Sequence, residues 1–330
     1  MVFVDMNDLI KETSIINNSK IQMNYNHKKL SSDNDIMVNI LSVKNQIEKT
    51  LENILPSENT WPVRLHKAQR HALLSPGKRF RPLLCCFIAN GLGQKDESVL
   101  LVGCVAEMVH SASLILDDLP CMDDADIRRN QPSTHMAFDE STAILSATAL
   151  LNEAFSIIAK LNNVTDTIKV KLVDLLSYTV GSNGLIAGQI ADLSNIKLNT
   201  SLEEVERLNT LKTGALFDFS VESAAILSGV SRNRKEYLRE FSHYLGLAFQ
   251  LMDDVKDKVL TQGAAKKSVG RDIGKATILA ISGSDESMRI LENYLYRAKK
   301  ALARAQLTNL DTFDALLSNQ FSFLDMNSIN

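Results

Sequence analysis

Two clusters of aspartates are the residues of this chain most able to do chemistry. The first cluster holds five carboxylates within ten positions: Asp117, Asp118, Asp123, Asp124 and Asp126. Pro120 lies inside it, where proline should end or kink the preceding helix and let Asp123 turn back toward Asp117. Carboxylate oxygens suit Mg²⁺, which proteins typically bind through one or two carboxylates plus substrate phosphates.

The second cluster consists of Asp253, Asp254 and Asp257. Asp253 and Asp257 stand four positions apart in a predicted helix, so both carboxylates project from one face. Two like charges at this spacing repel each other, and a divalent cation would turn that repulsion into attraction. Taken alone, this cluster is better explained as a solvated, acidic helix end.

Cations accompany the first cluster. Arg128 and Arg129 follow it directly, and a guanidinium group can bind phosphate oxygens with two parallel hydrogen bonds. Lys78, Arg79 and Arg81 lie upstream, beside a Pro-Gly turn at a predicted helix start, where free backbone N–H groups also favour an anion. Carboxylates for a metal next to cations for phosphate indicate a metal–diphosphate site, and the alternative is a structural network of salt bridges.

Other residues give weaker signals. His110 lies two helical turns before Asp117 on the same predicted face, but a single histidine is more often a core residue. Glycines such as Gly188 permit close helix packing, and Lys212 and Lys267 are point charges suited to diphosphate. None of these residues would identify a site by itself.

Composition narrows the classes of function. The chain has 330 residues, 45% of them hydrophobic and 23% charged, with a net charge of −3. The isoelectric point near 6.1 argues against a general nucleic-acid binder, which would need an excess of Lys and Arg. We therefore expect no nucleic acid among its partners, and any anionic ligand must be held by local cations or metal ions.

The cysteines and apolar segments suggest a cytoplasmic protein. Four cysteines in a chain of this size suit a reducing compartment, and we expect all of them to be small core residues: Cys85, Cys86, Cys104 and Cys121. No apolar run approaches the roughly 20 residues of a transmembrane helix, and the N-terminus does not resemble a secretory signal. Residues 1–34 form a variable or poorly ordered extension, for which a targeting role stays open.

The spacing of apolar residues predicts an all-α protein. All six prolines precede residue 133, so the last two hundred residues contain no strong helix breaker. Apolar residues recur with helical spacing and show no strand or hairpin pattern. Helices are expected over 36–55, 61–74, 78–92, 97–118, 139–161, 165–192, 201–230, 233–258 and 284–305. Residues 35–330 should form a single helical domain.

Taken together and in this order, these motifs resemble the trans-prenyl diphosphate synthases, most of all bacterial geranylgeranyl diphosphate synthases of the carotenoid-pathway type. The resemblance runs from about Lys67 to Ile281, and the stretch from His110 to Asp123 is especially similar to that subgroup. It implies the isoprenoid synthase fold, a bundle of long helices around a central apolar tunnel. It also implies a homodimer.

The resemblance assigns roles to individual residues. Five aspartates look like ligands of three Mg²⁺ ions in the substrate complex, with Asp254 a weaker candidate: Asp117, Asp118, Asp123, Asp253 and Asp257. Residues that match the allylic diphosphate site are Arg128, Lys212, Thr213, Gln250 and Lys267. Residues that match the isopentenyl diphosphate site are Lys78, Arg81, His110 and Arg129. The catalytic set comprises Asp117, Asp118, Asp123, Lys212, Asp253 and Lys267.

The implied reaction is Mg²⁺-dependent, head-to-tail (1'-4) condensation of isopentenyl diphosphate with allylic diphosphates of five to fifteen carbons. Ala112 and Ser113, five and four positions before Asp117, are small residues that leave room for a C20 product, geranylgeranyl diphosphate. Farnesyl diphosphate synthase, a longer-chain synthase and a catalytically weak partner subunit are the alternatives. A terpene cyclase or a helical scaffold fits the combined motifs less well.

Three residues depart from the family pattern. Thr148 stands where many relatives carry an acidic residue, and Asn209 where a histidine is common. Lys256 replaces an apolar residue inside the second aspartate cluster, and helical geometry predicts that it faces away from Asp253 and Asp257.

Overall fold

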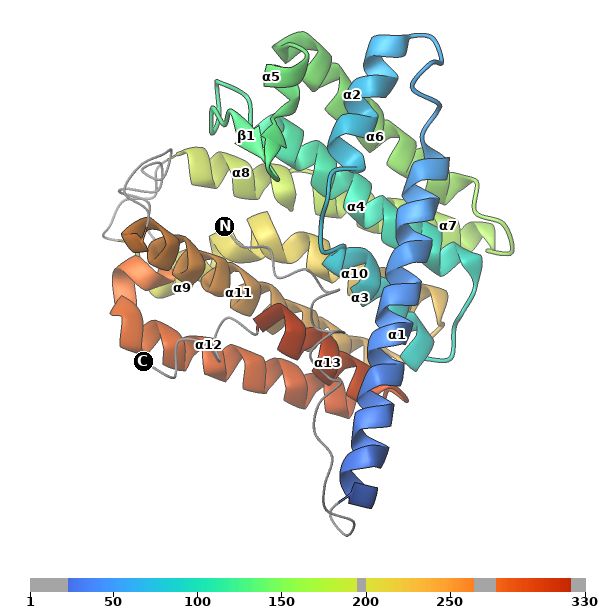
Figure 1. Cartoon of the computed structure of the whole chain (residues 1–330), viewed down its shortest axis with the longest axis vertical. Helices are drawn as coiled ribbons and strands as arrows, with labels where there is room; N and C mark the ends of the chain where they lie inside the picture. The colour runs from blue at the N-terminus through green and yellow to red at the C-terminus, as the bar shows by residue number, and fades with distance from the viewer. Residues whose placement is uncertain (1–22, 195–199, 264–276, 322–330) are drawn as a thin grey trace.

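The computed structural model describes residues 23–194, 200–263 and 277–321, and nearly all of this part is helical (Figure 1). The α-helices are α1 (Met23–Ile54), α2 (Val63–Leu73), α3 (Phe80–Gly91), α4 (Glu97–Asp117), α5 (Thr134–Ala137), α6 (Glu140–Ala159), α7 (Asp166–Val180), α8 (Leu185–Leu193), α9 (Leu202–Asn209), α10 (Ala215–Leu227), α11 (Arg232–Gly263), α12 (Ile278–Arg304) and α13 (Leu310–Phe321). A π-helical segment, η2 (Thr210–Gly214), joins α9 to α10. The prediction of an all-α fold is confirmed.

Two predicted helices are each divided in two. The helix expected over 165–192 breaks between α7 and α8, and this break requires glycine at position 184, because a Cβ there would stand 2.0 Å from the carbonyl oxygen of Thr179. The helix expected over 201–230 widens into η2, and such π segments occur frequently at functional sites. Both irregular segments border the candidate site.

A short hairpin was not predicted. β1 (Ile127–Arg128) pairs antiparallel with β2 (Gln131–Pro132) directly after the first aspartate cluster. Arg129 and Asn130 form its turn with positive φ angles of 51° and 63°. A ladder of two residues on each side is too short to produce the alternation on which strand prediction depends.

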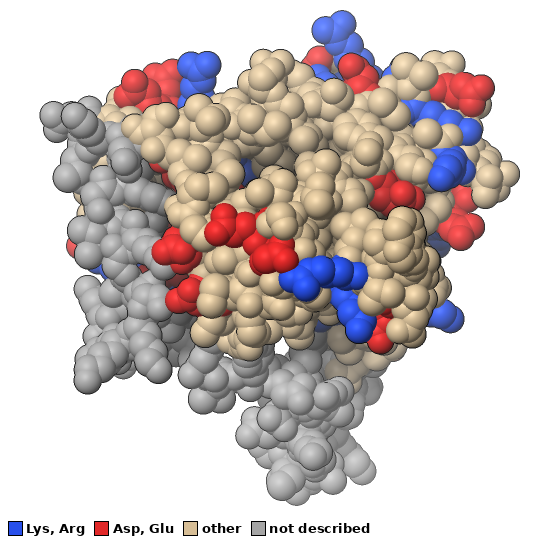
Figure 2. Space-filling model, turned by 90° about the horizontal axis from the view of Figure 1, so that it is seen from above, with Lys and Arg blue, Asp and Glu red and all other residues tan. Residues whose placement is uncertain are grey.

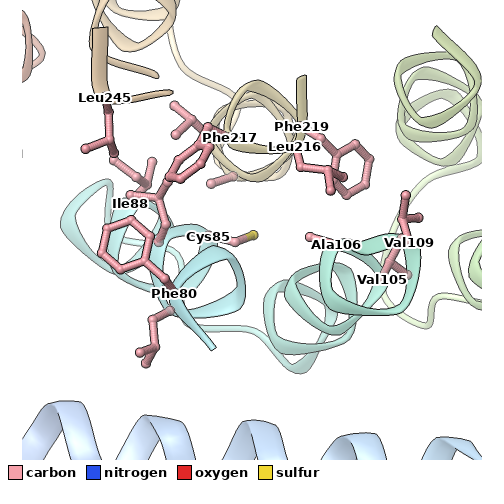
Figure 3. Close-up of a cluster of buried hydrophobic side chains, with 14 of the residues drawn as sticks. Phe80, Cys85, Ile88, Val105, Ala106, Val109, Leu216, Phe217, Phe219 and Leu245 are labelled. Carbon is pink, nitrogen blue, oxygen red and sulfur yellow. The ribbon is translucent and has the colours of Figure 1, made fainter. Parts of the chain in front are cut away.

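The core that supports the site is formed by α3, α4, α10 and α11 (Figure 3). Cys85 of α3, Ala106 of α4 and Phe217 of α10 are all completely buried. The rings of Phe80, Phe217 and Phe249 contact one another with centroid separations of 5.0–5.8 Å. These aromatic contacts fix the start of α3 against α10 and α11. Two of the three predicted cations, Lys78 and Arg79, directly precede this helix start.

Two predictions about the apolar segments are wrong. Cys121 is exposed in the loop after α4, whereas Cys85 and Cys104 are buried as predicted and Cys86 is partly buried. The second wrong prediction is that no apolar run approaches the length of a transmembrane helix. Among the described residues, α4 and α6 are each long and apolar enough to cross a membrane. A buried core helix can have the same length and composition, and the apolar window of α4 is 67% buried, against 33% for that of α6.

Candidate functional site

One cavity of about 460 Å³ gathers most of the predicted site residues. It lies between the start of α3, the end of α4, η2 and the middle of α11. The predicted residues that line it are Lys78, Arg81, His110, Ser113, Asp117, Arg128, Arg129, Lys212, Thr213, Gln250 and Asp253. Arg79, one of the three cations predicted upstream of the first cluster, also lines it, and lining residues to which the sequence assigned no role in the site are Phe80, Glu107, Leu114, Leu185, Gln189, Leu216, Phe249 and Gln320. The two aspartate clusters, far apart in the sequence, therefore meet at one cavity.

The first aspartate cluster folds back on itself. α4 ends at Asp117, and the Asp123 backbone N–H donates to the Asp117 carbonyl oxygen at 2.8 Å. Ala125 N–H donates to the Asp118 carbonyl oxygen at 3.0 Å, which closes a second turn. Pro120 lies inside this loop, so the prediction that Asp123 turns back toward Asp117 is confirmed.

Asp118 is held away from the cavity. Its carboxylate is buried and accepts hydrogen bonds from Arg128 Nε at 2.9 Å and from the Arg128 terminal nitrogen at 2.5 Å. Burial raises the pKa of Asp118, and the Arg128 guanidinium partly opposes that increase. Asp118 thus fixes the arginine that lines the cavity, and it does not itself line the cavity.

Asp117 on α4 and Asp253 on α11 line the same cavity. Burial raises the pKa of each to about 6. This value already includes a smaller opposing effect, because Lys212 lowers the pKa of Asp117 and Lys256 lowers that of Asp253. A desolvated carboxylate binds a cation more strongly than a solvated one, and hard oxygen ligands suit Mg²⁺. The residues present therefore fit a divalent cation that a diphosphate would share.

The remaining predicted metal ligands lie further out. Asp123 and Asp257 do not line the cavity, and Asp257 is exposed on α11. Over residues 23–194, 200–263 and 277–321, no group of three His, Cys, Asp or Glu side chains is close enough to hold a metal ion. A metal at this site would accordingly need ligands from a bound phosphate as well as from the protein.

Cations gather at one end of the cavity. Arg81 lies over the ring of Phe217 at 5.0 Å, and its buried Nε has no hydrogen-bond partner within the described part of the chain. Burial lowers the pKa of Lys78, as does the neighbouring Lys256, while Asp253 raises it. A buried donor without a partner is costly, so this end of the cavity favours an anion.

A buried ionic network behind these cations was not predicted. Arg79 is completely buried and donates to Glu107 at 2.7 Å and to Glu48 at 2.9 and 3.1 Å. Arg129 lies 3.5 Å from the same Glu107 carboxylate and donates to Ser75 Oγ at 3.1 Å. The network therefore fixes the Arg129 guanidinium at the cavity wall.

η2 presents Lys212 and Thr213 to the cavity. Lys212 pairs with Asp192 of α8 at 2.5 Å, and Thr213 Oγ1 donates to Gln250 Oε1 at 2.5 Å. Gln250 Nε2 in turn donates to Asp254 at 2.9 Å, and Asp254 itself does not line the cavity. η2 is thus bonded to α8 on one side and to α11 on the other.

His110 and the two predicted chain-length residues share α4. Burial and the surrounding arginines, Arg81 first, lower the pKa of His110 well below its ordinary value, so the imidazole is neutral at pH 7. Ser113 lines the cavity, whereas Ala112 is completely buried beside it in the core. The cavity has apolar walls at Leu114 and Leu216, next to the charged end.

The three departures have different surroundings. Lys256 is half-buried on α11, and its charge lowers the pKa of Asp253. The Asn209 side chain is buried, and its Nδ2 is without a hydrogen-bond partner in the part of the chain that the structure describes. Thr148 is exposed and donates to the Ile144 carbonyl oxygen. Lys267 lies outside the described residues.

An all-helical fold with aspartates and cations around one cavity is the architecture of an enzyme that handles diphosphates. The family model for polyprenyl synthetase matches residues 62–309. The geranylgeranyl diphosphate synthase of Pantoea ananas is 39% identical over 261 residues, which cover 78% of this chain and 85% of that protein. The farnesyl diphosphate synthase of Bacillus subtilis is 34% identical over 79% of this chain and 90% of its own length.

A solved structure agrees with these sequence comparisons. The crystal structure of an FPP/GFPP synthase from Zymomonas mobilis superimposes with a TM-score of 0.75 and 32% identity, covering 87% of this chain and 98% of that one. The chain belongs to the polyprenyl synthetase family, and it is a prenyltransferase.

Proposed function

We propose that the chain condenses isopentenyl diphosphate with allylic diphosphates in a Mg²⁺-dependent, head-to-tail reaction. The observation that carries this proposal is the single cavity that joins Asp117 and Asp253 to cations from α3, the β1–β2 turn and η2. Two diphosphates in one site need this much positive charge, whereas the net charge of the chain is −3.

The side chains divide between two diphosphate groups. Arg128 and Lys212, with the Thr213–Gln250 pair, would hold the allylic diphosphate and stabilise its negative charge as the allylic C–O bond breaks. Lys78, Arg81 and Arg129 would hold isopentenyl diphosphate so that its double bond attacks the allylic C1. The new C–C bond leaves a carbocation, which loses a proton to the departed diphosphate.

Metal binding is proposed for the two aspartate clusters. Asp117 and Asp253 would hold Mg²⁺ from the two sides of the cavity, with Asp123 and Asp257 reached once a diphosphate is bound. Bound Mg²⁺ would supply Lewis-acid stabilisation of the leaving diphosphate. The apolar residues Leu114 and Leu216 would keep water from the reacting carbon.

We propose geranylgeranyl diphosphate as the product, because Ser113 at the cavity wall and Ala112 behind it are both small. Farnesyl diphosphate is the second candidate, supported by the similarity to the Bacillus subtilis farnesyl diphosphate synthase. Replacing Ala112 with Phe should shorten a C20 product, and an unchanged product length would mean that the wall of the tunnel lies elsewhere.

The activity test uses purified protein, isopentenyl diphosphate and each of the C5, C10 and C15 allylic diphosphates, with Mg²⁺ or with EDTA. We expect turnover only with Mg²⁺, and a C20 product from all three starters. Absence of turnover with every starter would refute the proposed condensation and favour a partner subunit. A C15 product that persists with excess isopentenyl diphosphate would refute the C20 assignment.

We also propose that the chain forms a homodimer through α5 and α6. The side chains of Met136, Ile144 and Leu145 are apolar and exposed there, and the apolar window of α6 is only 33% buried. Figure 2 looks onto the end of the molecule where α2, α5 and α6 lie in Figure 1, and much of this face is uncharged. A second copy meeting this face would bury apolar surface that water otherwise contacts.

A further inference from the structure

Gln320 brings the C-terminal helix into the candidate site. It lies near the end of α13, is 6% exposed and lines the cavity together with Lys78 and Arg81. Lys78 Nζ donates a hydrogen bond to Gln320 Oε1 at 3.2 Å, although the two residues are 242 positions apart. A residue beyond the 62–309 region of the family match thus touches a predicted substrate-binding lysine.

The position of Gln320 is fixed by the packing of its helix. Phe313, Leu317 and Phe321 of α13 are buried, and α13 packs against α1 and α3. The ring of Phe313 stands edge-on to that of Phe241 in α11, with centroids 6.1 Å apart. Because α13 is anchored along one face, the Gln320 amide is held at the cavity by the helix and is not a freely moving surface group.

The amide has a donor to offer. Within residues 23–194, 200–263 and 277–321, Gln320 Nε2 donates no hydrogen bond, while Oε1 is engaged by Lys78. Arg81 Nε, in the same cavity, is likewise without an acceptor among these residues. Three donors from α13 and from the Lys78–Arg81 segment therefore line one cavity, and a diphosphate oxygen is the acceptor that suits them.

We propose that Gln320 is a substrate-binding residue for isopentenyl diphosphate. Its Nε2 donates to the diphosphate, and its Oε1 holds the Lys78 ammonium beside the same group. This inference rests on the proposed function, because it assigns a further residue to one of the two diphosphates.

The test separates the two substrates. Gln320→Glu keeps an acceptor for Lys78, loses the donor and adds a negative charge, so the KM for isopentenyl diphosphate should rise about tenfold or more. Gln320→Leu removes both contacts and should raise it about fivefold or more. In both variants the KM for the allylic diphosphate should stay within about twofold. Ser318→Ala, an exposed site on the same helix, is the matched control and should change neither.

Two results would overturn the proposal: a KM for isopentenyl diphosphate within about twofold of wild type in both variants, or an equal rise for both substrates. Thermal melting of each variant shows whether it folds as wild type does. If one of the two variants is misfolded, Gln320→Asn, which keeps the amide on a shorter side chain, takes its place in the comparison. If wild type turns over no substrate, the proposed function fails. Calorimetric titration of isopentenyl diphosphate into wild type and Gln320→Glu then tests the binding role separately, and equal affinities would overturn it.

Discussion

Glu107 is a buried carboxylate that holds two arginines at the candidate site. It is 2% exposed and pairs with Arg79 at 2.7 Å and with Arg129 at 3.5 Å. Burial also desolvates both arginines, so the Glu107 carboxylate compensates their charge, and Glu48 adds a second carboxylate for Arg79. Glu107 thus serves the site by holding the Arg129 guanidinium in position.

Replacing Glu107 with Gln should lower the free energy of unfolding by about 3 kcal/mol, because it leaves buried guanidinium charge uncompensated. It should also raise the KM for isopentenyl diphosphate more than that for the allylic substrate. Denaturant unfolding and steady-state kinetics measure the two effects. Glu97→Gln, at an exposed position of the same helix, is the control and should cost at most about 1 kcal/mol. A Glu107→Gln variant as stable as this control would contradict the account.

Residues with repeated spacing could be predicted from the sequence, and residues with long-range partners could not. Asp117 and Asp253 stand out because each belongs to a cluster, and the cavity contains both. Glu107 is a single acid inside an apolar helix, and nothing near it in the sequence indicates Arg79 as its partner. Arg79 itself adopts a positive φ of 52°, which aims its side chain into the interior in a way that helical periodicity does not predict.

At the scale of elements, the close approach of α8 to η2 depends on one glycine. A Cβ at Gly188 would stand 2.5 Å from the Lys212 backbone nitrogen. A side chain there must therefore push η2 away and move Lys212 off its pairing with Asp192.

Gly188→Ala should destabilise the protein by about 1–3 kcal/mol, since the contact is with backbone and cannot relax by a side-chain rotation. Its kcat should fall more than its stability alone explains, because Lys212 leaves the cavity wall. Gly214→Ala is the matched control, since a Cβ there would meet its nearest atom at 3.7 Å and its φ is −62°. Thermal melting and single-turnover kinetics compare the two variants. Equal effects would show that the approach of α8 to η2 is not critical.

A half-buried carboxyl joins α10 to α11. Asp218 accepts a hydrogen bond from Ser242 Oγ, and burial raises the pKa of Asp218 to about 7. This value lies above the ordinary 3.8, so the folded chain favours the neutral form. Asp218 therefore contributes most to the free energy of unfolding below pH 3.8, and this contribution is lost as the pH rises to about 7.

Asp218→Asn removes this loss while keeping an acceptor for Ser242. Relative to wild type, the variant should gain about 2 kcal/mol of stability between pH 5 and pH 8. Denaturant unfolding at about pH 5, 6.5 and 8 measures the difference, because the shift predicts a change across this window. The exposed Asp174→Asn is the control and should show no such trend. A constant difference between Asp218→Asn and wild type would contradict the raised pKa.

Most of the helices could be predicted to within about six residues, but α1 begins at Met23, 13 residues before its predicted start at Ile36. α3, α4 and α6 end within two residues of their predicted limits because prolines, glycines and apolar spacing mark them locally. η2 lies against α8 at Gly188, and the α7–α8 break brings Gly184 against the end of α7, so the local sequence indicates only glycines in these segments. α13 was not predicted, and the contact that gives it importance, Gln320 with Lys78, spans most of the chain.

At the scale of the whole molecule, packing leaves different kinds of surface on different helices. α4 is largely buried between α3, α6 and α10, which leaves its C-terminal residue, Asp117, at the cavity. α6 covers one side of α4 and turns its other side outward, with Leu145 62% exposed. An apolar helix that is half covered within one chain is well suited to contact a second copy.

Leu145→Glu should therefore weaken the proposed homodimer, because it places a charge in an interface that must exclude water. Sedimentation velocity over a concentration series should show the variant dissociating at concentrations at least about tenfold higher than wild type does. Val170→Glu is the matched control, since Val170 is 67% exposed on α7, outside the α5–α6 face, and should leave association unchanged. If wild type sediments as a monomer at every concentration, the homodimer proposal fails. If both variants remain dimers of wild-type affinity, α6 is not the interface and another apolar surface must form it.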